Sequence, residues 1–347
     1  MDPPDLGRAE GAERVIPYSP PRSIDRLPLI ELGDARLPDS RRARAVAAAL
    51  REACVNVGFF YLGGHDVPQA LLDGQLEWTR RLFALPLSIR QQVAMRNSRV
   101  RRGFEPIATQ VLDAGTPPDL KESFYLGRDL GPDHPYVRAG LAGYGANQWP
   151  DGIPGFRAQM ETYLDQLAAL SRDMMRILAL SLELPRDYFD AMMREPMPVL
   201  RLIHYPPHPV DARANQLGAG AHTDWGALTF LLQDDSGGLE VQNVAGEWVA
   251  APPVPGTFVV NLGDMVERWT NGLYRSTLHR VLNRASGRSR YSVPYFSNPD
   301  FNARVECLPT CTDAAHPPRY APCTAGQHLK ESFELSYARG PAQALRS

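Results

Sequence analysis

Lysine is almost missing from this chain of 347 residues: the 37 basic residues include only Lys121 and Lys330, and all the others are arginine. The arginines are scattered through an Ala-rich and Pro-rich sequence, which indicates a compositional bias rather than a binding surface. Positive charge is not in excess, because 39 acidic residues leave a formal net charge of −2. Without a broad basic surface to neutralise phosphates, we expect no nucleic-acid partner.

Long apolar runs and secretion signals are lacking too. No uninterrupted apolar segment reaches the ~20 residues of a membrane span. The N-terminus has acidic residues and prolines where a signal peptide needs a basic start and an apolar stretch. Neither GxGxxG nor GxxxxGK occurs, so no phosphate-binding glycine loop is expected. These absences predict a cytoplasmic protein that does not bind membranes.

Cysteine is scarce and has no metal-binding pattern. Cys54, Cys307, Cys311 and Cys323 include no CxxC pair and no histidine at zinc-finger spacing, so reduced thiols are expected. The CxxxC spacing of Cys307 and Cys311 suggests a metal site at first sight. Because no further ligands accompany the pair, two incidental thiols are the simpler interpretation, and any role of the pair stays open.

The chain falls into four stretches, which we expect to pack as one integrated domain. Residues 1–26 are rich in Pro, Arg and acidic residues without periodicity, which predicts a mobile N-terminal arm. Residues 27–194 form a helical and mixed region, residues 195–300 a core rich in β-strands, and residues 301–347 a C-terminal segment with a helix.

Hydrophobic spacing predicts helices in the first half and strands in the second. Apolar residues recurring at steps of four and three predict helices from Asp39 to Gly58, over 68–83 and 86–95, after Pro154 for about six turns, and over Ala325–Ala338. The aromatic run Phe59–Leu62 predicts a strand. Beyond residue 195 the predicted strands are Val199–Tyr205, Ala227–Gln233, Leu239–Gln242, Trp248–Ala250, Thr257–Leu262, Ser276–Asn283 and Arg290–Phe296. Many short strands at close spacing predict a double-sheet sandwich or barrel, so the fold class is mainly β with flanking α-helices.

A polar triplet stands directly before one of these strands, in the sequence His222-Thr223-Asp224. In an extended strand residues i and i+2 point to the same face, so His222 and Asp224 present an imidazole nitrogen and a carboxylate oxygen side by side. These are two metal ligands. An isolated HxD also has a surface or capping interpretation, and the residues that follow decide between them.

A third ligand is expected on the strand Ser276–Asn283. This strand and Arg290–Phe296 flank a turn-like segment at 284–289, which predicts a hairpin that sets His279 opposite residues 290–292. By alternation Arg290 and Ser292 share one face, so the hairpin brings a third ligand and a buried guanidinium to the same interior.

Two histidines and one carboxylate with free coordination positions are typical of non-haem Fe(II) oxygenases. A closed structural zinc site needs a fourth protein ligand, which His204 or His208 could supply. The prolines between these two residues make that segment stiff, so zinc is the minor alternative.

The order His222-x-Asp224, His279 and Arg290-x-Ser292 resembles the Fe(II)/2-oxoglutarate dioxygenases of the isopenicillin N synthase-like family. Segments at 27–34, 58–67, 102–105, 119–124, 147–150 and 261–264 are similar to the family as well, so the resemblance covers about residues 27 to 338. It implies a double-stranded β-helix, or jelly roll, with Fe(II) at the open end of the barrel.

The resemblance also implies roles for single residues. His222, Asp224 and His279 would be the catalytic iron ligands, and Arg290 with Ser292 would hold the distal carboxylate of 2-oxoglutarate. Tyr205 matches a tyrosine that contacts this co-substrate, whereas Ile203 replaces an asparagine common in plant members. O2 would be the second co-substrate, ascorbate would stimulate, and a small molecule would be hydroxylated, desaturated or cyclised with release of succinate and CO2.

By analogy, the residues expected to line the substrate pocket are Phe104, Phe124, Tyr295, Phe296 and Arg102. An aromatic lining favours an apolar, ring-bearing metabolite, and Arg102 near the mouth would pair with an acidic group or be solvated. Two alternatives remain: an iron oxidase like isopenicillin N synthase that needs no 2-oxoglutarate, and a non-catalytic jelly-roll binding module. We expect a monomer or a weak homodimer.

Overall fold

The computed structural model describes residues 15–16, 20–37, 40–113, 116–209, 216–283 and 287–338. Most of the predicted N-terminal arm, residues 1–14 and 17–19, lies outside this set. Two described residues of this stretch contact the body of the protein: Ile16 is buried and its backbone N–H donates to the Thr310 carbonyl (2.8 Å), and the Ile24 carbonyl accepts from Asn243 Nδ2 (3.1 Å).

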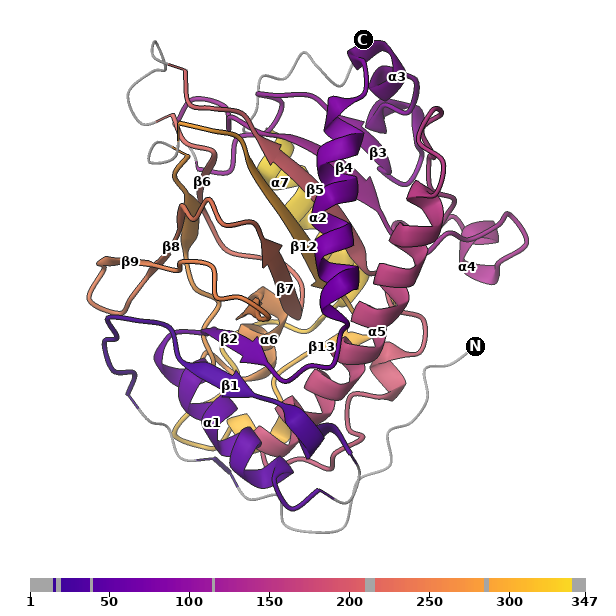
Figure 1. Cartoon of the computed structure of the whole chain (residues 1–347). Helices are drawn as coiled ribbons and strands as arrows, with labels where there is room; N and C mark the ends of the chain where they lie inside the picture. Colours follow the sequence, from indigo (N-terminus) through magenta and orange to yellow (C-terminus); the bar gives the residue numbers. More distant parts are fainter. Residues whose placement is uncertain are drawn as a thin grey trace.

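Most of the helices lie in the first half of the chain, whereas the second half consists mainly of strands (Figure 1). The helices are α1 (Ala43–Asn56), α2 (Gln69–Ala84), α3 (Leu87–Gln92), α4 (Pro135–Arg138), α5 (Phe156–Ser181), α6 (Asp264–Trp269) and α7 (Ala325–Ala338). The strands are β1 (Leu29–Glu31), β2 (Phe59–Gly63), β3 (Gly103–Glu105), β4 (Glu122–Leu126), β5 (Val199–Tyr205), β6 (Ala219–His222), β7 (Leu228–Gln233), β8 (Leu239–Gln242), β9 (Trp248–Ala250), β10 (Phe258–Leu262), β11 (His279–Val281), β12 (Arg290–Ser297), β13 (Arg304–Val305) and β14 (Cys323–Thr324).

Two sheets form the centre of the molecule. The larger has the order β1-β2-β10-β7-β12-β5-β4-β3, and the smaller has the order β6-β11-β8-β9. One apolar cluster joins Phe59 of β2 and Val259 of β10, from the larger sheet, to Val241 of β8 and Val281 of β11, from the smaller. The two sheets therefore pack face to face, as in a jelly roll. Strands from both halves of the chain enter the larger sheet, so the N-terminal region is part of the core.

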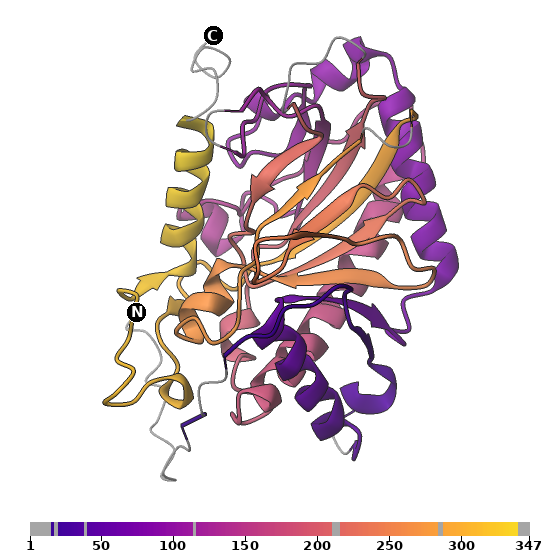
Figure 2. The same cartoon turned by 90° about the vertical axis from the view of Figure 1, so that its left-hand side faces the viewer.

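The other face of the larger sheet is covered by helices. Helices α2 and α5 lie side by side on it (Figure 1). The predicted apolar stripe of α5 is fully buried, including Met160, Tyr163 and Leu167 at 0% exposure, because its spacing matches the helical repeat. Figure 2 shows helix α7 on the side of the strands opposite to α2. Among the helices that the structure describes, none has the length and apolarity that crossing a bilayer demands.

The predicted hairpin of residues 276–296 is wrong. Strand β11 pairs with β6 and β8 in the smaller sheet, whereas β12 pairs with β5 and β7 in the larger one. The chain thus crosses between the sheets, as jelly rolls do, because each strand finds its apolar partners far away in sequence. Part of the connecting segment, residues 284–286, lies outside the described residues.

Candidate metal centre and active site

The three predicted ligands converge through strand pairing. His222 ends β6 and His279 begins β11, and the two residues are direct partners across this antiparallel pair. Their ring centroids are 4.2 Å apart. Asp224 lies just beyond the end of β6 rather than within the strand, and its Oδ1 is 3.9 Å from His222 Nε2 and 3.7 Å from His279 Nε2. The ligand atoms all lie within 4.8 Å of one another.

The outer nitrogen of each imidazole is held by a backbone carbonyl. His222 Nδ1 lies 2.8 Å from the Gly220 oxygen, and His279 Nδ1 lies 3.1 Å from the Thr277 oxygen. Because a carbonyl only accepts, both Nδ1 atoms carry the proton, and both Nε2 lone pairs are left for a metal. Burial and the neighbouring His279 lower the pKa of His222 to about 3, so this ring is neutral at physiological pH.

Hydrogen bonds also orient the carboxylate of Asp224, which here is the acceptor. Asp224 Oδ2 accepts hydrogen bonds from Thr229 Oγ1 (2.6 Å) and Asn261 Nδ2 (2.7 Å), which leaves Oδ1 facing the histidines. Burial alone raises the pKa of a carboxyl, but the two histidines and these two hydrogen bonds outweigh it, so the pKa of Asp224 lies below its usual value. Sequence reasoning assigned no role to Thr229 or Asn261.

The chemistry of the donor set fits ferrous iron. Two neutral imidazole nitrogens and one carboxylate oxygen form the facial triad of non-haem Fe(II) oxygenases. The alternative of closed zinc lacks its fourth ligand. His204 is bound by Glu122 Oε1 (2.8 Å) and Ser289 Oγ (3.0 Å), and His208 Nε2 lies 2.9 Å from the Gln216 oxygen. In the part of the chain that the structure describes, no further His, Cys, Asp or Glu joins the cluster.

A small cavity of about 60 Å³ opens from the triad between the two sheets. Arg290, Ser292 and Tyr205 all line it, together with the three ligands. The Arg290 side chain is 1% exposed; its Nε donates to the Gly237 oxygen (2.7 Å) and its Nη2 to Gln233 Oε1 (3.2 Å). Its Nη1 is buried without a hydrogen-bond partner in the described structure. An unpartnered buried guanidinium nitrogen fits a cavity that receives a carboxylate.

A buried ion pair that sequence reasoning did not identify also borders this cavity. Lys121 Nζ contacts Asp119 Oδ2, and both side chains are buried. Asp119 Oδ1 accepts a hydrogen bond from the backbone N–H of Gly220 (2.9 Å), two residues before His222. The pair therefore ties the segment before β4 to the strand that carries the first ligand.

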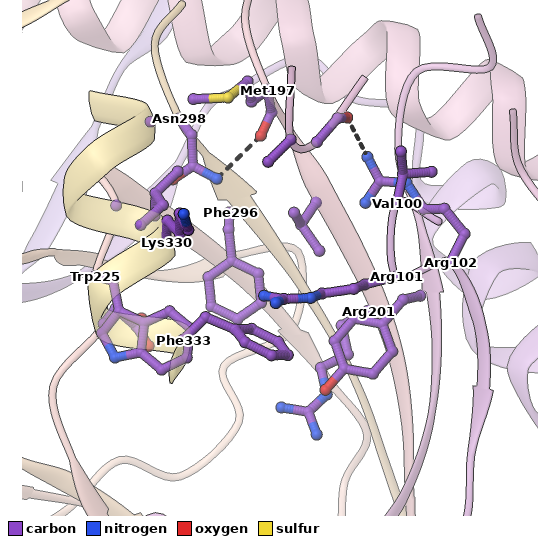
Figure 3. A pocket seen from close by; sticks show the side chains of 18 of the residues that line it. Val100, Arg101, Arg102, Met197, Arg201, Trp225, Phe296, Asn298, Lys330 and Phe333 are labelled. Atoms are coloured by element: carbon purple, nitrogen blue, oxygen red, sulfur yellow. Dashed lines mark hydrogen bonds between the residues drawn. The ribbon is translucent and has the colours of Figure 1, made fainter. Parts of the chain in front are cut away.

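A larger cavity of about 320 Å³ also reaches the triad, and Figure 3 shows side chains that line it. The residues that it shares with the small cavity are Leu112, Arg201, His222, Asp224 and Phe296. Its walls come from the segment 99–102, from Trp225 just after the HxD triplet, and from helix α7. The residues of α7 that line it are Gly326, Leu329, Lys330 and Phe333.

Only two of the five residues expected in the substrate pocket line this cavity, namely Phe296 and Arg102. Arg102 is buried, so it is not solvated at the mouth. The expectation for the other three is corrected. Phe104 packs under Arg90 (5.0 Å), Phe124 packs edge-on against Phe156 (6.0 Å), and Tyr295 packs against Phe230 (6.2 Å). Neighbouring strand residues face opposite sides, so Tyr295 points into the core while Phe296 reaches the cavity.

The cavity residues that sequence reasoning missed are Tyr125, Arg201, Trp225 and Phe333. Strand alternation is the one signal that could have found Tyr125, which follows the buried Phe124. The cysteines take no part: all four are free thiols, and burial raises the pKa of Cys307 and of Cys311, the latter to about 11.

Comparisons with known proteins agree with this geometry. Residues 196–299 match the 2OG-Fe(II) oxygenase superfamily, and residues 27–152 match the N-terminal region of non-haem dioxygenases in morphine synthesis. The chain is 37% identical over 323 residues to the 2-oxoglutarate-Fe(II) type oxidoreductase hxnY of Emericella nidulans, and the match covers 91% of each chain. It is 37% identical over 314 residues to a homoarginine-6-hydroxylase of Glycine max, covering 88% of this chain and 94% of that one.

A solved structure supports the same assignment. A full-length Neurospora crassa protein in complex with alpha-KG, which is 2-oxoglutarate, and thymine superimposes with a TM-score of 0.79 at 28% identity. The match covers 90% of this chain and 97% of that one. The alternatives of a non-catalytic module and of an oxidase without 2-oxoglutarate therefore fall away. This chain belongs to the 2-oxoglutarate-dependent Fe(II) oxygenase superfamily and is an oxidoreductase that holds Fe(II) with His222, Asp224 and His279.

Proposed function

We propose that this enzyme oxidises a small organic molecule by hydroxylation, desaturation or ring closure, and converts 2-oxoglutarate and O2 to succinate and CO2. The observation that carries the proposal is the meeting of two unlike cavities at one triad. The small one contains an unpartnered guanidinium nitrogen and suits a compact dicarboxylate. The large one is lined by aromatic side chains and suits a ring-bearing substrate.

Bound iron and 2-oxoglutarate supply the activation of O2, which protein side chains cannot provide. The chain contributes geometry. Backbone carbonyls fix the tautomers of His222 and His279, and Thr229 and Asn261 aim one oxygen of Asp224 at the same point. Because these partners are already in place, ordering the ligands adds little to the free-energy cost of metal binding.

Arg290, Ser292 and Tyr205 would hold the co-substrate. A planar guanidinium binds a carboxylate through two parallel hydrogen bonds, and Arg290 keeps Nη1 without a protein partner. Its Nε and Nη2 are fixed by Gly237 and Gln233, so the group is oriented before the co-substrate arrives. The Tyr205 ring lies 4.8 Å from the Arg290 guanidinium carbon and restricts it from the side.

A turnover screen tests the proposal. The purified protein with Fe(II), 2-oxoglutarate and O2 is incubated with a metabolite library, and mass spectrometry follows succinate and the substrate together. We expect succinate to form in step with a product that has gained oxygen or lost hydrogen, and His222→Ala to abolish both signals. Substrate oxidation that proceeds without 2-oxoglutarate would contradict the proposal, and so would tight substrate binding without any O2 consumption.

A further inference from the structure

Arginine is common in this chain, but buried arginine is rare. The buried arginines in the described structure are Arg102, Arg201 and Arg290, with exposures of 3%, 7% and 1%. All three line a cavity: Arg290 the small one, Arg102 the large one and Arg201 both. Since a buried charge is costly unless it is paired, the partners of these three side chains are informative.

Arg201 is paired within the protein. Its guanidinium lies 3.2 Å from Glu105 Oε2 and donates to Ser123 Oγ (3.0 Å) and Gln110 Oε1 (3.1 Å). Arg102 and Arg290 differ from it, because neither has a carboxylate within ion-pair distance among the described residues. Arg290 faces the cavity proposed for the distal carboxylate of 2-oxoglutarate. Arg102 is likewise buried without a carboxylate partner among the described residues, in the cavity proposed for the substrate.

The contacts of Arg102 leave its charge largely uncompensated. Nη2 donates to the Gly143 oxygen at 3.0 Å, and Nε is buried without a partner (Figure 3). The carboxylate of Asp129 acts on it only from a distance, since that group is bound by Trp149 Nε1 (3.0 Å) and Arg157 (3.1 Å). Burial lowers the pKa of Arg102 to about 10, which still leaves the guanidinium charged at neutral pH.

Aromatic and cationic side chains line the large cavity, beside aliphatic ones such as Met95, Leu112 and Leu329. Trp225 and Phe333 meet edge to face at 6.2 Å, and the Arg101 guanidinium lies 3.4 Å above the Phe333 ring (Figure 3). Lys330 adds a further positive charge to the same wall. Among the lining residues that the structure describes, the one carboxylate is that of Asp224, which is committed to the metal. Within this described lining no acidic side chain is therefore available to neutralise Arg102.

On the basis of the proposed function, we propose that the substrate is an aromatic carboxylate whose carboxylate group is bound by Arg102 and whose ring packs against Trp225, Phe296 and Phe333. The planar guanidinium matches a carboxylate, and the aromatic walls match a flat ring. Arg102 and the metal ligands line the same cavity. A molecule anchored at Arg102 therefore presents the part away from its carboxylate to the iron.

Calorimetry with matched acids and amides tests this recognition without turnover. Benzoic, cinnamic and 2-naphthoic acids, each beside its primary amide, are titrated into protein loaded with Fe(II) and saturating 2-oxoglutarate under anaerobic conditions. Saturating 2-oxoglutarate keeps the acids out of the small cavity. We expect at least one acid to bind about tenfold or more tightly than its amide, because a charge-assisted pair is lost in the amide.

Two variants assign the preference to Arg102. Arg102→Met removes the acid preference, whereas Arg96→Met, at an exposed arginine outside the cavity lining, keeps it. If Arg102→Met does not fold, the comparison of acid and amide on the unmodified protein decides alone. Amides that bind as tightly as their acids, or acids that do not bind at all, would overturn the inference. A separate titration with 2-oxoglutarate distinguishes this outcome from failure of the proposed function, which requires that 2-oxoglutarate bind.

Discussion

The two cavities that meet at His222 and Asp224 are built from different parts of the fold. Strand residues supply most of the polar groups of the small cavity, including His279 on β11, Arg290 and Ser292 on β12, and Tyr205 on β5. Strand residues such as Phe296 line the large cavity too, but much of its wall comes from segments between strands, such as 99–102 and Trp225, and from the C-terminal helix α7.

This difference separates shared chemistry from specificity. Strand β12 is hydrogen-bonded to β5 on one side and to β7 on the other, and Arg290 is paired with Tyr205 of β5, so the backbone that carries Arg290 and Ser292 is fixed within the sheet. Loops and a terminal helix tolerate substitution far better. The small cavity can therefore keep one co-substrate across a family, while the large one changes its ligand with few consequences for the fold.

The largest expected effect comes from the triad that both cavities share. His222→Ala removes one of three ligands, so we expect iron to be lost. The activation free energy of the reaction should rise by several kcal/mol, which lowers turnover roughly a thousandfold or more. Metal analysis and succinate formation measure the two losses. His316→Ala, at an exposed histidine far along the chain, serves as the control and should retain both. A His222→Ala protein with full iron content and turnover would refute the assignment of the metal site.

The next effect is confined to the small cavity. Arg290→Lys keeps the positive charge but loses the planar guanidinium, whose nitrogens donate to Gly237 and Gln233 and would bind the co-substrate. A loss of about 1.5–3 kcal/mol is expected for such a charge-assisted pair, so the KM for 2-oxoglutarate should rise roughly 10- to 150-fold. Succinate assays over a range of 2-oxoglutarate concentrations measure it. The exposed Arg288→Lys should leave KM unchanged. If both variants behave alike, Arg290 does not bind the co-substrate.

A smaller effect, on the affinity for Fe(II), is expected from a residue that orients a metal ligand. Asn261→Ala removes the 2.7 Å hydrogen bond to Asp224 Oδ2 and leaves the carboxylate held by Thr229 alone. Losing such a partner weakens metal affinity by about tenfold or somewhat more. Anaerobic competition with a chelator measures the Kd for Fe(II), with Asn97→Ala, an exposed asparagine, as the matched control. Unchanged iron affinity would mean that Asn261 serves only the packing of β10.

How far the sequence anticipates this site depends on how local each signal is. The stripe of α5 and the bounds of β8 and β9 follow from neighbouring residues, and the structure agrees with them. The hairpin failed because the partners of β11 lie far earlier in the chain. Thr229 and Asn261 were missed for a related reason: they occupy β7 and β10, and only the folded sheet brings them to Asp224.

A pentapeptide that occurs twice shows how far local sequence alone can predict the environment of a residue. Leu-Lys-Glu-Ser-Phe occurs at residues 120–124 and again at 329–333. The first copy leads into β4, where strand alternation sends Phe124 into the core. The second lies within α7, where residues four apart share a face, and Leu329 and Phe333 both line the large cavity. Identical local sequence thus yields a core residue in one place and a residue that lines the large cavity in the other, because tertiary context decides.

The smallest expected effect on ligand binding comes from Phe333, and Phe124 serves as its comparison for stability. Phe124 is fully buried, so Phe124→Ala should cost about 3–5 kcal/mol of unfolding free energy. Phe333 is half-buried, so Phe333→Ala should change stability by less than about 1 kcal/mol and weaken binding of an aromatic ligand about fivefold, as loss of one aromatic contact does. Thermal unfolding and calorimetry measure the two quantities. The KM for 2-oxoglutarate should stay unchanged in Phe333→Ala, because Phe333 lines the large cavity but not the small one. If that KM rises together with the ligand Kd, α7 supports the whole site, and the division between a fixed and a variable cavity does not hold.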